Sequence, residues 1–525
     1  MQETLDLIKQ AFELKSQNCY KQAIELLYKA LEIESDNIEI IYQLGELYFL
    51  LANLPRALHY TEKVLSINEN HIEALKLTQK IYEYSNDLEK AFNIAEKIYK
   101  IEQNQQNIIE LIKLSSKKGD ISKIQDFDTP EQNNDKILYQ IAKAYYDNKI
   151  QEKAQAKLEQ ILNINSENEE ALVLLGKIYF DKSEFEKSKQ IFNTFPKTSE
   201  NPEVLNYLGL FALEELNFIE AIKLFSKASA KNKKNAKYLY NLANAYFYNG
   251  WIKEAAASYL QAICLEPENY GYRYSLAYMY YEQKSFEKAQ NEINYILENN
   301  ENFAPAHVLN ALLKFENKDY LGAKNELETN LKNNNDDNFT LVSLSKVYTE
   351  LAMFDKAENA IKTVISRTPD SLNYQCQMAE ILIAEKKYDD AINLVENVIN
   401  QNDNYISAYI IGAKASFEKG NIQKAKEFAQ NAIDLDMNFS GGYYYLGLVR
   451  FEEKDYDEAI ECIKRAIIHD VENASYYAKM SEIYKAKEDY KTALDYIKEA
   501  ENISGSTEYR LEYKKLASIN RKTKI

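Results

Sequence analysis

Apolar residues recur along the chain with the spacing of an α-helix, in paired runs that together occupy about 34 residues. In residues 236–269, Leu239, Leu242 and Tyr246 fall on one side of a first helix, which is expected to end near Gly250. A glycine just past the last periodic residue favours a left-handed turn, so the chain is predicted to reverse direction there. A second helix is predicted to follow.

This second helix carries small residues at the positions that face the first. Ala255, Tyr259 and Ala262 lie on one side of it, and Pro267 just beyond cannot continue a helix. Ala243 and Ala255 let the two backbones approach closely, while larger side chains fill the space around the contact. The segment therefore predicts an antiparallel helical hairpin.

Residue types of this hairpin return at fixed positions through the chain. A column of small residues, interrupted once, consists of Ala23, Ala57, Ala91, Ala154, Ser188, Ala221, Ala255, Ala289, Ala323, Ala357, Ala391, Ala425, Ala459 and Ala493. A tyrosine slot in the first helix, predicted to be core, holds Tyr48, Tyr82, Tyr145, Tyr179, Tyr246, Tyr280, Tyr348 and Tyr484. A single hairpin leaves its apolar faces uncovered, so each hairpin is predicted to stack on its neighbours.

Leu-Gly pairs also occupy one place in the first helix, as in Leu44-Gly45, Leu208-Gly209 and Leu446-Gly447. Together with the tyrosine slot and the alanine column, this pattern resembles the tetratricopeptide repeat family. The resemblance implies an all-α fold, an α-solenoid in the form of a right-handed superhelix of about 15 helix-turn-helix repeats. It also implies a scaffold or adaptor that binds other proteins or peptides on its concave face.

The repeat divides the chain into four parts. Residues 4–105 are predicted to hold units 1–3, and residues 135–507 to hold units 5–15. Residues 106–134 form a short, degenerate unit, either a hinge or a decayed repeat, where we expect a break in packing. A second irregular joint is expected near residues 196–202, where two prolines lie close together. Residues 508–525 are predicted to form a capping helix with a basic tail.

Composition limits the partners. With only 13 Gly and 7 Pro, few turns can be of the types that need them, which argues against a β-rich fold. The 81 acidic and 64 basic residues give a net charge of −17, and Lys and Arg are not segregated, so we expect no nucleic-acid partner. A basic cluster at the C-terminus is interpreted as a solvated end: Lys514, Lys515, Arg521, Lys522 and Lys524.

Signals of export, membrane insertion and catalysis are not found in the sequence. The first residues lack the positive flank of a secretory signal, and no run reaches the roughly 18 apolar residues of a membrane span, so a cytoplasmic protein is expected. The four cysteines form no CxxC pair, the four histidines occupy unrelated slots, and no nucleophile or phosphate-loop motif is present. We therefore expect no enzyme, no cofactor and no metal site.

An enzyme-related alternative comes from residues 241–246, which are similar to the superhelical repeat arrays of glycosyltransferases. Those enzymes carry a separate catalytic domain after the repeats, whereas only 18 residues follow residue 507 here. The alternative is therefore a regulatory or substrate-recruiting subunit of a separately encoded enzyme, such as a glycosyltransferase.

The surface predicted to bind a partner is a stripe on the first helices, at positions i, i+4 and i+7. In repeats seven to ten the stripe carries no charge and consists of Asn206, Leu210 and Leu213; Tyr240, Asn244 and Phe247; Tyr274, Tyr278 and Tyr281; Val308, Leu312 and Phe315. Lys177 and Lys346 bound it in the flanking repeats. It is predicted to be a peptide groove, with packing between adjacent first helices as the alternative.

Asn241 joins this candidate set for a different reason. In family members that capture a C-terminal carboxylate, Lys and Asn residues on three successive first helices form a clamp. Lys237, Asn241 and Asn244 match that pattern in one repeat, but the neighbouring repeats do not. Recognition of a C-terminal tail by such a clamp is therefore not expected.

Overall fold

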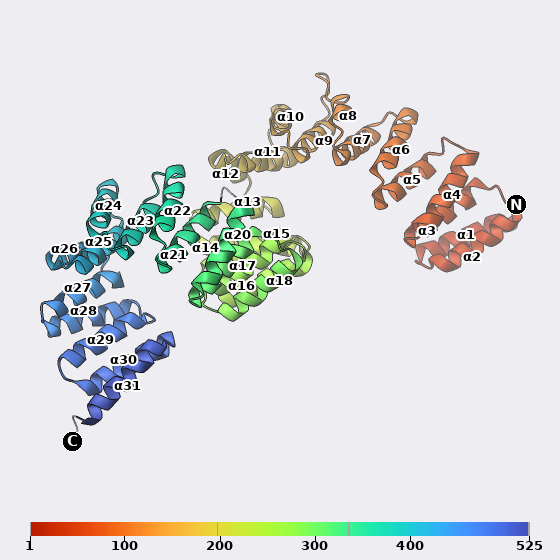
Figure 1. The fold of residues 1–525 in the computed structure, drawn as a ribbon. Helices are drawn as coiled ribbons and strands as arrows, with labels where there is room; N and C mark the ends of the chain where they lie inside the picture. The colour runs from red at the N-terminus through yellow and green to blue at the C-terminus, as the bar shows by residue number, and fades with distance from the viewer. Residues whose placement is uncertain (1, 197, 334–336, 523–525) are drawn as a thin grey trace. The chain divides into compact units, whose positions relative to one another are not determined.

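The computed structural model describes residues 2–196, 198–333 and 337–522, and within these ranges every regular element is an α-helix. The chain forms two compact units, Met1–Leu265 and Glu266–Ile525. Within each unit, a helix packs mainly against the next helix in the sequence, and first helices also contact the first helices of adjacent repeats. Figure 1 shows the resulting series of antiparallel helix pairs.

Unit 1 contains α1 (Gln2–Ser16), α2 (Tyr20–Ile33), α3 (Ile38–Leu50), α4 (Leu54–Ile67), α5 (Ile72–Tyr84), α6 (Leu88–Ile101), α7 (Gln105–Lys118), α8 (Ile121–Gln125), α9 (Asp135–Asp147), α10 (Gln151–Ile164), α11 (Glu169–Asp181), α12 (Phe185–Asn193), α13 (Pro202–Glu214), α14 (Phe218–Lys231), α15 (Ala236–Tyr248) and α16 (Ile252–Leu265).

Unit 2 contains α17 (Tyr270–Glu282), α18 (Phe286–Asn299), α19 (Ala304–Glu316), α20 (Tyr320–Asn333), α21 (Asn338–Glu350), α22 (Phe354–Arg367), α23 (Leu372–Ala384), α24 (Tyr388–Gln401), α25 (Ile406–Lys419), α26 (Ile422–Leu435), α27 (Ser440–Glu452), α28 (Tyr456–His469), α29 (Ala474–Ala486), α30 (Tyr490–Ser504) and α31 (Thr507–Lys522).

The column of small residues lies where the two helices of each hairpin meet. All of its members are fully buried, as predicted. Ser188 is the one member of the column that is not alanine. Its hydroxyl donates a hydrogen bond of 2.8 Å to the carbonyl oxygen of Gly176 in the facing helix. A residue with positive φ precedes each column position by five residues, for example Gly250 (φ 80°) before Ala255. The left-handed turn therefore sets which residue of the second helix meets the first.

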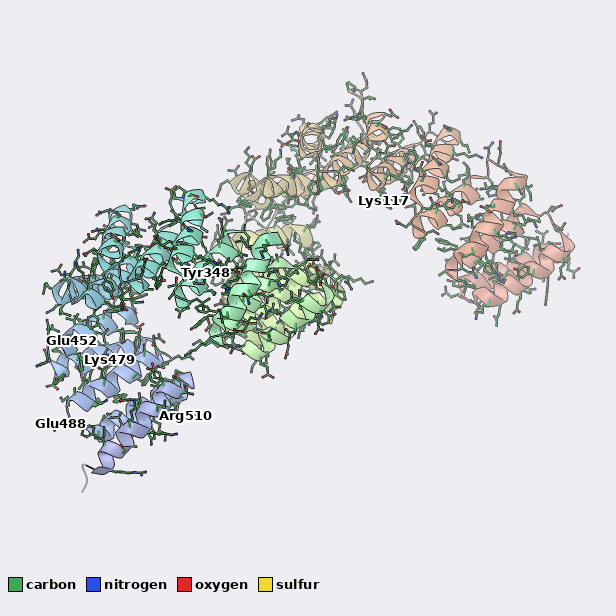
Figure 2. All side chains as sticks on the ribbon, in the orientation of Figure 1. Lys117, Tyr348, Glu452, Lys479, Glu488 and Arg510 are labelled. Atoms are coloured by element: carbon green, nitrogen blue, oxygen red, sulfur yellow. The ribbon has the colours of Figure 1, made fainter. Side chains whose placement is uncertain are left out.

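The tyrosine slot also packs in the core, as predicted. Tyr48, Tyr145 and Tyr348, the last labelled in Figure 2, are buried, and the other members are half-buried. In six repeats the Lys or Arg eight residues later lies over the tyrosine ring, 5.2 to 5.5 Å from its centroid. Each such cation lies over the face of a ring and adds a cation–π attraction to the packing.

In the short unit at residues 106–134, the second helix, α8, has only 5 residues. Ile124 of α8 is nevertheless fully buried, in one core cluster with Ile112 of α7 and Leu138 of α9. The expected break in packing is therefore wrong. Ile124 lies five residues after Gly119 (φ 75°), at the position that small residues occupy in the regular hairpins, and it closes the core there.

The irregular joint expected near residues 196–202 lies between α12 and α13 and includes residue 197, which is outside the described residues. α12 has 9 residues, whereas α10 and α14 have 14 each. Phe192 of α12 is fully buried, and its ring stacks on that of Tyr207 with centroids 4.6 Å apart. A Cβ atom at Gly176 would lie 2.6 Å from the Phe192 ring, so this glycine makes room for the ring.

The last helix, α31, covers the end of unit 2. Leu516 is fully buried and packs with Ala493 and Ile497 of α30. Arg510, labelled in Figure 2, makes an ion pair of 2.7 Å with Glu501. Of the basic tail expected at the C-terminus, Lys524 lies outside the described residues.

Candidate peptide-binding surface

In unit 1 the two asparagines of the candidate set join neighbouring first helices. Asn206 of α13 and Asn241 of α15 are 3% and 5% exposed, and Asn241 Nδ2 donates to Asn206 Oδ1 over 2.7 Å. Because their amides are buried and bonded to each other, both residues hold the stack together. They are not open to a peptide in this arrangement.

The remaining candidates of unit 1 are half-buried: Leu210, Leu213, Tyr240, Asn244 and Phe247. Asn244 Oδ1 accepts a hydrogen bond of 2.5 Å from the hydroxyl of Tyr259 in α16, which leaves its amide NH₂ as the outward donor. The Tyr240 ring lies 5.9 Å from that of Tyr259, and the Phe247 ring 5.5 Å from that of Tyr248. These side chains pack against their own hairpin and remain partly exposed.

In unit 2 three tyrosines of α17 form a continuous row. The ring centroids of Tyr274 and Tyr278, and those of Tyr278 and Tyr281, are each 6.5 Å apart. All three are half-buried, and the Tyr281 hydroxyl donates to Glu316 Oε1 over 3.2 Å. Burial raises the pKa of Tyr274 and Tyr281, so both hydroxyls stay protonated at neutral pH. The row offers apolar ring surface with neutral hydrogen-bonding groups.

The next first helix, α19, supplies the last three candidates of the stripe. Val308 is 1% exposed and packs in the core cluster of α19 and α21, whereas Leu312 and Phe315 are half-buried. The Phe315 ring meets that of Tyr320 edge-on at 5.2 Å. Phe315 also lines a pocket of about 280 Å³ that extends onto the following first helices.

This pocket is formed only by first helices. It is lined by Phe315 of α19; Lys346, Thr349 and Glu350 of α21; Gln377, Glu380, Ile381 and Ala384 of α23; and Lys414 of α25. Lys346 and Thr349, Glu380, and Lys414 occupy the positions that continue the stripe in α21, α23 and α25. The pocket therefore lies on the predicted side of the helices. It begins where the uncharged patch ends and charged stripe positions follow.

A smaller pocket of about 200 Å³ lies on the same register in unit 1. Its lining includes Lys76, Lys80 and Glu83 of α5, which are stripe positions in that helix, together with Glu110 of α7 and with Ala95 and Ile98 of the second helix α6. Lys117 of α7, labelled in Figure 2, pairs with Glu83 over 3.1 Å. In unit 1 the stripe of α5 thus borders a hollow that one second helix helps to form.

The predicted surface does not include the charged residues that line the unit 2 pocket, because it is defined by uncharged stripe positions alone. Lys346 and Glu380 are exposed and Lys414 is half-buried. Gln377 is 7% exposed, and its Nε2 donates to the carbonyl oxygen of Val342 over 3.0 Å, which fixes one wall. The sequence signal was present, because the same i, i+4, i+7 reading of α21, α23 and α25 gives these charges.

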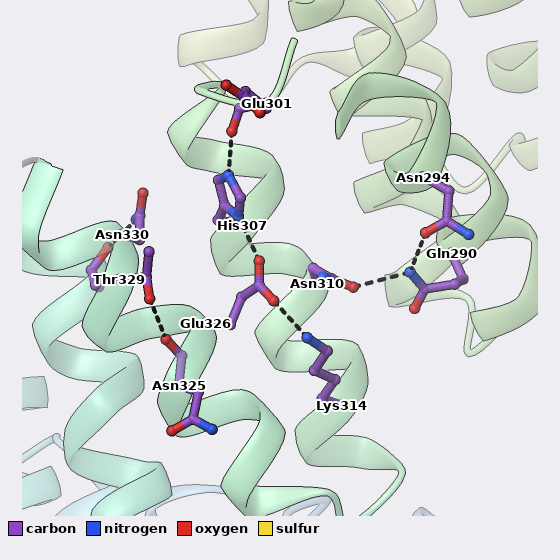
Figure 3. Close-up of polar contacts among 11 residues, drawn as sticks. Gln290, Asn294, Glu301, His307, Asn310, Lys314, Asn325, Glu326, Thr329 and Asn330 are labelled. Carbon is purple, nitrogen blue, oxygen red and sulfur yellow. Dashed lines mark hydrogen bonds and ion pairs between the residues drawn. The ribbon is translucent and has the colours of Figure 1, made fainter. Parts of the chain in front are cut away.

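The opposite side of α19 packs against its own second helix through charged groups (Figure 3). Glu326 of α20 receives Lys314 Nζ and His307 Nδ1, each at 2.5 Å from a carboxylate oxygen. His307 Nε2 lies 2.6 Å from the carbonyl oxygen of Glu301. Burial alone would raise the pKa of Glu326, but the hydrogen bonds with Lys314 and His307 outweigh it and lower that pKa. This cluster closes the hairpin, and no metal-binding group of residues is found in the described ranges.

Stacked helical hairpins with an uncovered face on their first helices define the α-solenoid class of repeat proteins. Family models described as tetratricopeptide repeat match residues 14–81 and 240–297. A model of the anaphase-promoting complex, cyclosome, subunit 3, matches residues 384–466. Over these three segments, which lie in both units, the chain is a repeat protein of the tetratricopeptide type. Comparison with curated proteins gives no match.

Solved structures with this fold are distant. The APC/C hetero-tetramer Cut9-Hcn1 aligns over 91% of this chain and 96% of that chain, with 13% identity and a TM-score of 0.47. A tetratricopeptide repeat protein from Parabacteroides merdae covers 48% of this chain over 99% of its own, with 20% identity and a TM-score of 0.41. Yeast Tom70 covers 95% of both chains, with 15% identity and a TM-score of 0.38.

No helix in the described part of the chain is long and apolar enough to cross a membrane.

Proposed function

We propose that this protein is a non-enzymatic adaptor that binds peptide segments of other proteins along the stripe of its first helices. The observation that carries the proposal is the position of the two pockets. One lies in each unit, and both fall on the register that the stripe defines. A surface that repeats in register along a solenoid suits a peptide that runs across several repeats.

The chemistry of the unit 2 surface suits a segment with apolar and charged residues side by side. Tyr274 and Tyr278 offer ring surface at small entropic cost, and the Tyr274 hydroxyl can meet a peptide backbone. Beyond Phe315, the pocket adds two positively charged side chains, Lys346 and Lys414, and the negatively charged Glu380. A bound segment would place apolar side chains on the rings and charged ones in the pocket.

The test combines affinity with stability on the same variants. Partners captured from the protein's own cell extract are identified by mass spectrometry, and labelled segments of them are titrated against the purified chain. We expect Tyr274→Ala in unit 2, and separately Phe247→Ala in unit 1, to weaken binding by about 1–2 kcal/mol while helical content is unchanged. Leu321→Ala, at a 61% exposed position of the second helix α20, is the matched control and should leave affinity unchanged.

The melting temperature of each variant separates binding from packing. If Tyr274→Ala lowered the melting temperature and left affinity intact, the tyrosine row would be part of the core and the proposal would fail for unit 2. A purified chain that turned over a substrate unaided would contradict the non-enzymatic part of the proposal.

A further inference from the structure

A run of lysines without acidic neighbours lies in unit 1. No Asp or Glu occurs between Glu220 and Glu254, although acidic residues outnumber basic ones in the whole chain. Five exposed lysines at the end of α14, in the following turn and at the start of α15 form what we name the lysine patch: Lys227, Lys231, Lys233, Lys234 and Lys237. The expectation that basic residues are not segregated is wrong for this stretch.

The patch is poorly neutralised by the protein itself. Lys231 Nζ pairs with Glu200 at 2.7 Å, and Glu200 also feels the charge of Lys227. Lys233, Lys234 and Lys237 make no ion pair with any residue that the structure describes. Lys227 and Lys231 are one helical turn apart on the same face of α14, so their charges also repel each other.

Equivalent turns elsewhere in the chain carry the opposite charge. In turns of the form seen here, two turn residues lie between a second helix and the next first helix, and here both are lysines, Lys233 and Lys234. In all but one of the other turns of this form that the structure describes, an acidic residue occupies one of the two places: Asp36, Glu69, Glu167, Glu268, Glu301, Asp370, Asp403 and Glu472. An acidic residue there interacts favourably with the partial positive charge at the start of the following helix, whereas a lysine is repelled by that charge.

At the start of α15 these lysines oppose the helix dipole, whereas at the end of α14 they match it. The reversed charge is not needed to hold a turn of this form, because the other turns of this form lack it. An exposed charge pattern that the other repeats do not share suits the binding of a partner.

We propose that the lysine patch is a docking surface for a short acidic segment of a partner protein. The surface is separate from the first-helix stripe and does not depend on the function proposed for it. A short carboxylate-rich peptide matches the patch in charge and extent. A nucleic acid would extend beyond the patch and would be repelled there by a chain of net charge −17.

The probe is a fluorescein-labelled peptide of about ten Glu and Asp residues, titrated against the full chain at low salt by fluorescence anisotropy. Replacing the five patch lysines by Gln should weaken its binding by about tenfold or more. A matched variant removes the same number of charges from other exposed positions of unit 1 by replacing Lys9, Lys21, Lys29, Lys136 and Lys149 by Gln, and it should change binding by less than about twofold.

Several controls decide the interpretation. The melting temperature of the patch variant should not fall, because like-charge repulsion is relieved. A peptide of Gln and Asn of the same length should not bind. Equal losses in the two lysine variants would overturn the proposal. Tighter patch-dependent binding of single-stranded RNA or of phosphatidylserine vesicles would also overturn it. So would a change in sedimentation coefficient of the patch variant, since the occupant would then be a second copy of the chain.

Discussion

The hairpins α15–α16 and α7–α8 bury a residue at the same position, five residues after a left-handed glycine, but the two residues differ greatly in size. In α15–α16 it is Ala255, and the second helix continues for 14 residues. In α7–α8 it is Ile124, and the second helix has 5 residues. Where the second helix is long, a small residue lets the two helices pack closely. Where the second helix is short, a larger residue takes the same position.

The difference indicates what a repeat needs in order to stack. The large side chain of Ile124 fills its core position, together with Ile112 and Ile137 of the adjacent first helices. Ala255 fills the equivalent position by allowing a close approach of two backbones. A hairpin can therefore lose most of its second helix and still pass an unbroken core to its neighbours.

Shrinking the bulky contact should have the largest effect. Ile124→Ala would leave a cavity in a short helix with few other contacts, and we expect it to cost about 2–5 kcal/mol in the free energy of unfolding of unit 1. Urea unfolding followed by circular dichroism measures this. Gln125→Ala at the exposed neighbouring position is the control. Equal losses in the two variants would mean that α8 does not hold the core.

Enlarging the small contact is the converse change. Ala255→Leu should overpack the α15–α16 hairpin and cost about 1–3 kcal/mol, because two helix backbones would have to separate. Lys253→Leu on the exposed side of the same helix should have little effect on thermal unfolding. If both substitutions were harmless, the assigned contact between α15 and α16 would be incorrect.

The α19–α20 hairpin, in which Glu326 pairs with His307 and Lys314, should lose stability at low pH. This is the smallest of the three expected effects on stability. The folded-state pKa of Glu326 is lowered from its ordinary value of 4.5, so its ionised form stabilises the fold above that pH. This contribution should be lost as the pH falls below 4.5 through the folded-state pKa. Glu326→Gln, which lacks the titrating carboxyl, should make acid unfolding of unit 2 less dependent on pH in this range. An unchanged pH profile would show that the ion pairs of Figure 3 contribute nothing to stability.

The sequence was sufficient to predict the regular hairpins because the same small residue returns at a constant period. It was insufficient at the short unit, because a column read at a period of 34 points to Gln125 and misses Ile124. Counting five residues from Gly119 would have found it. The division between Leu265 and Glu266 was not predicted, since the repeats on both sides of it have the same residue types.

For the candidate surface, periodicity gave the side of the helix but not the degree of exposure. Asn206, Asn241 and Val308 are on the predicted side, yet contacts with neighbouring first helices bury them. Such burial depends on how closely successive helices approach, which no spacing within one helix reveals. The role of the exposed members in binding stays a prediction.

Packing between successive helices also has a kinetic consequence. Contacts between residues close in sequence close only short loops, so each hairpin should form rapidly, on the order of microseconds to milliseconds, without waiting for distant segments. Formation can begin at any stable hairpin and spread to its neighbours. Openings of the native chain should be equally local, and amide hydrogen exchange would then reveal a gradient of protection along the array in place of a single global value.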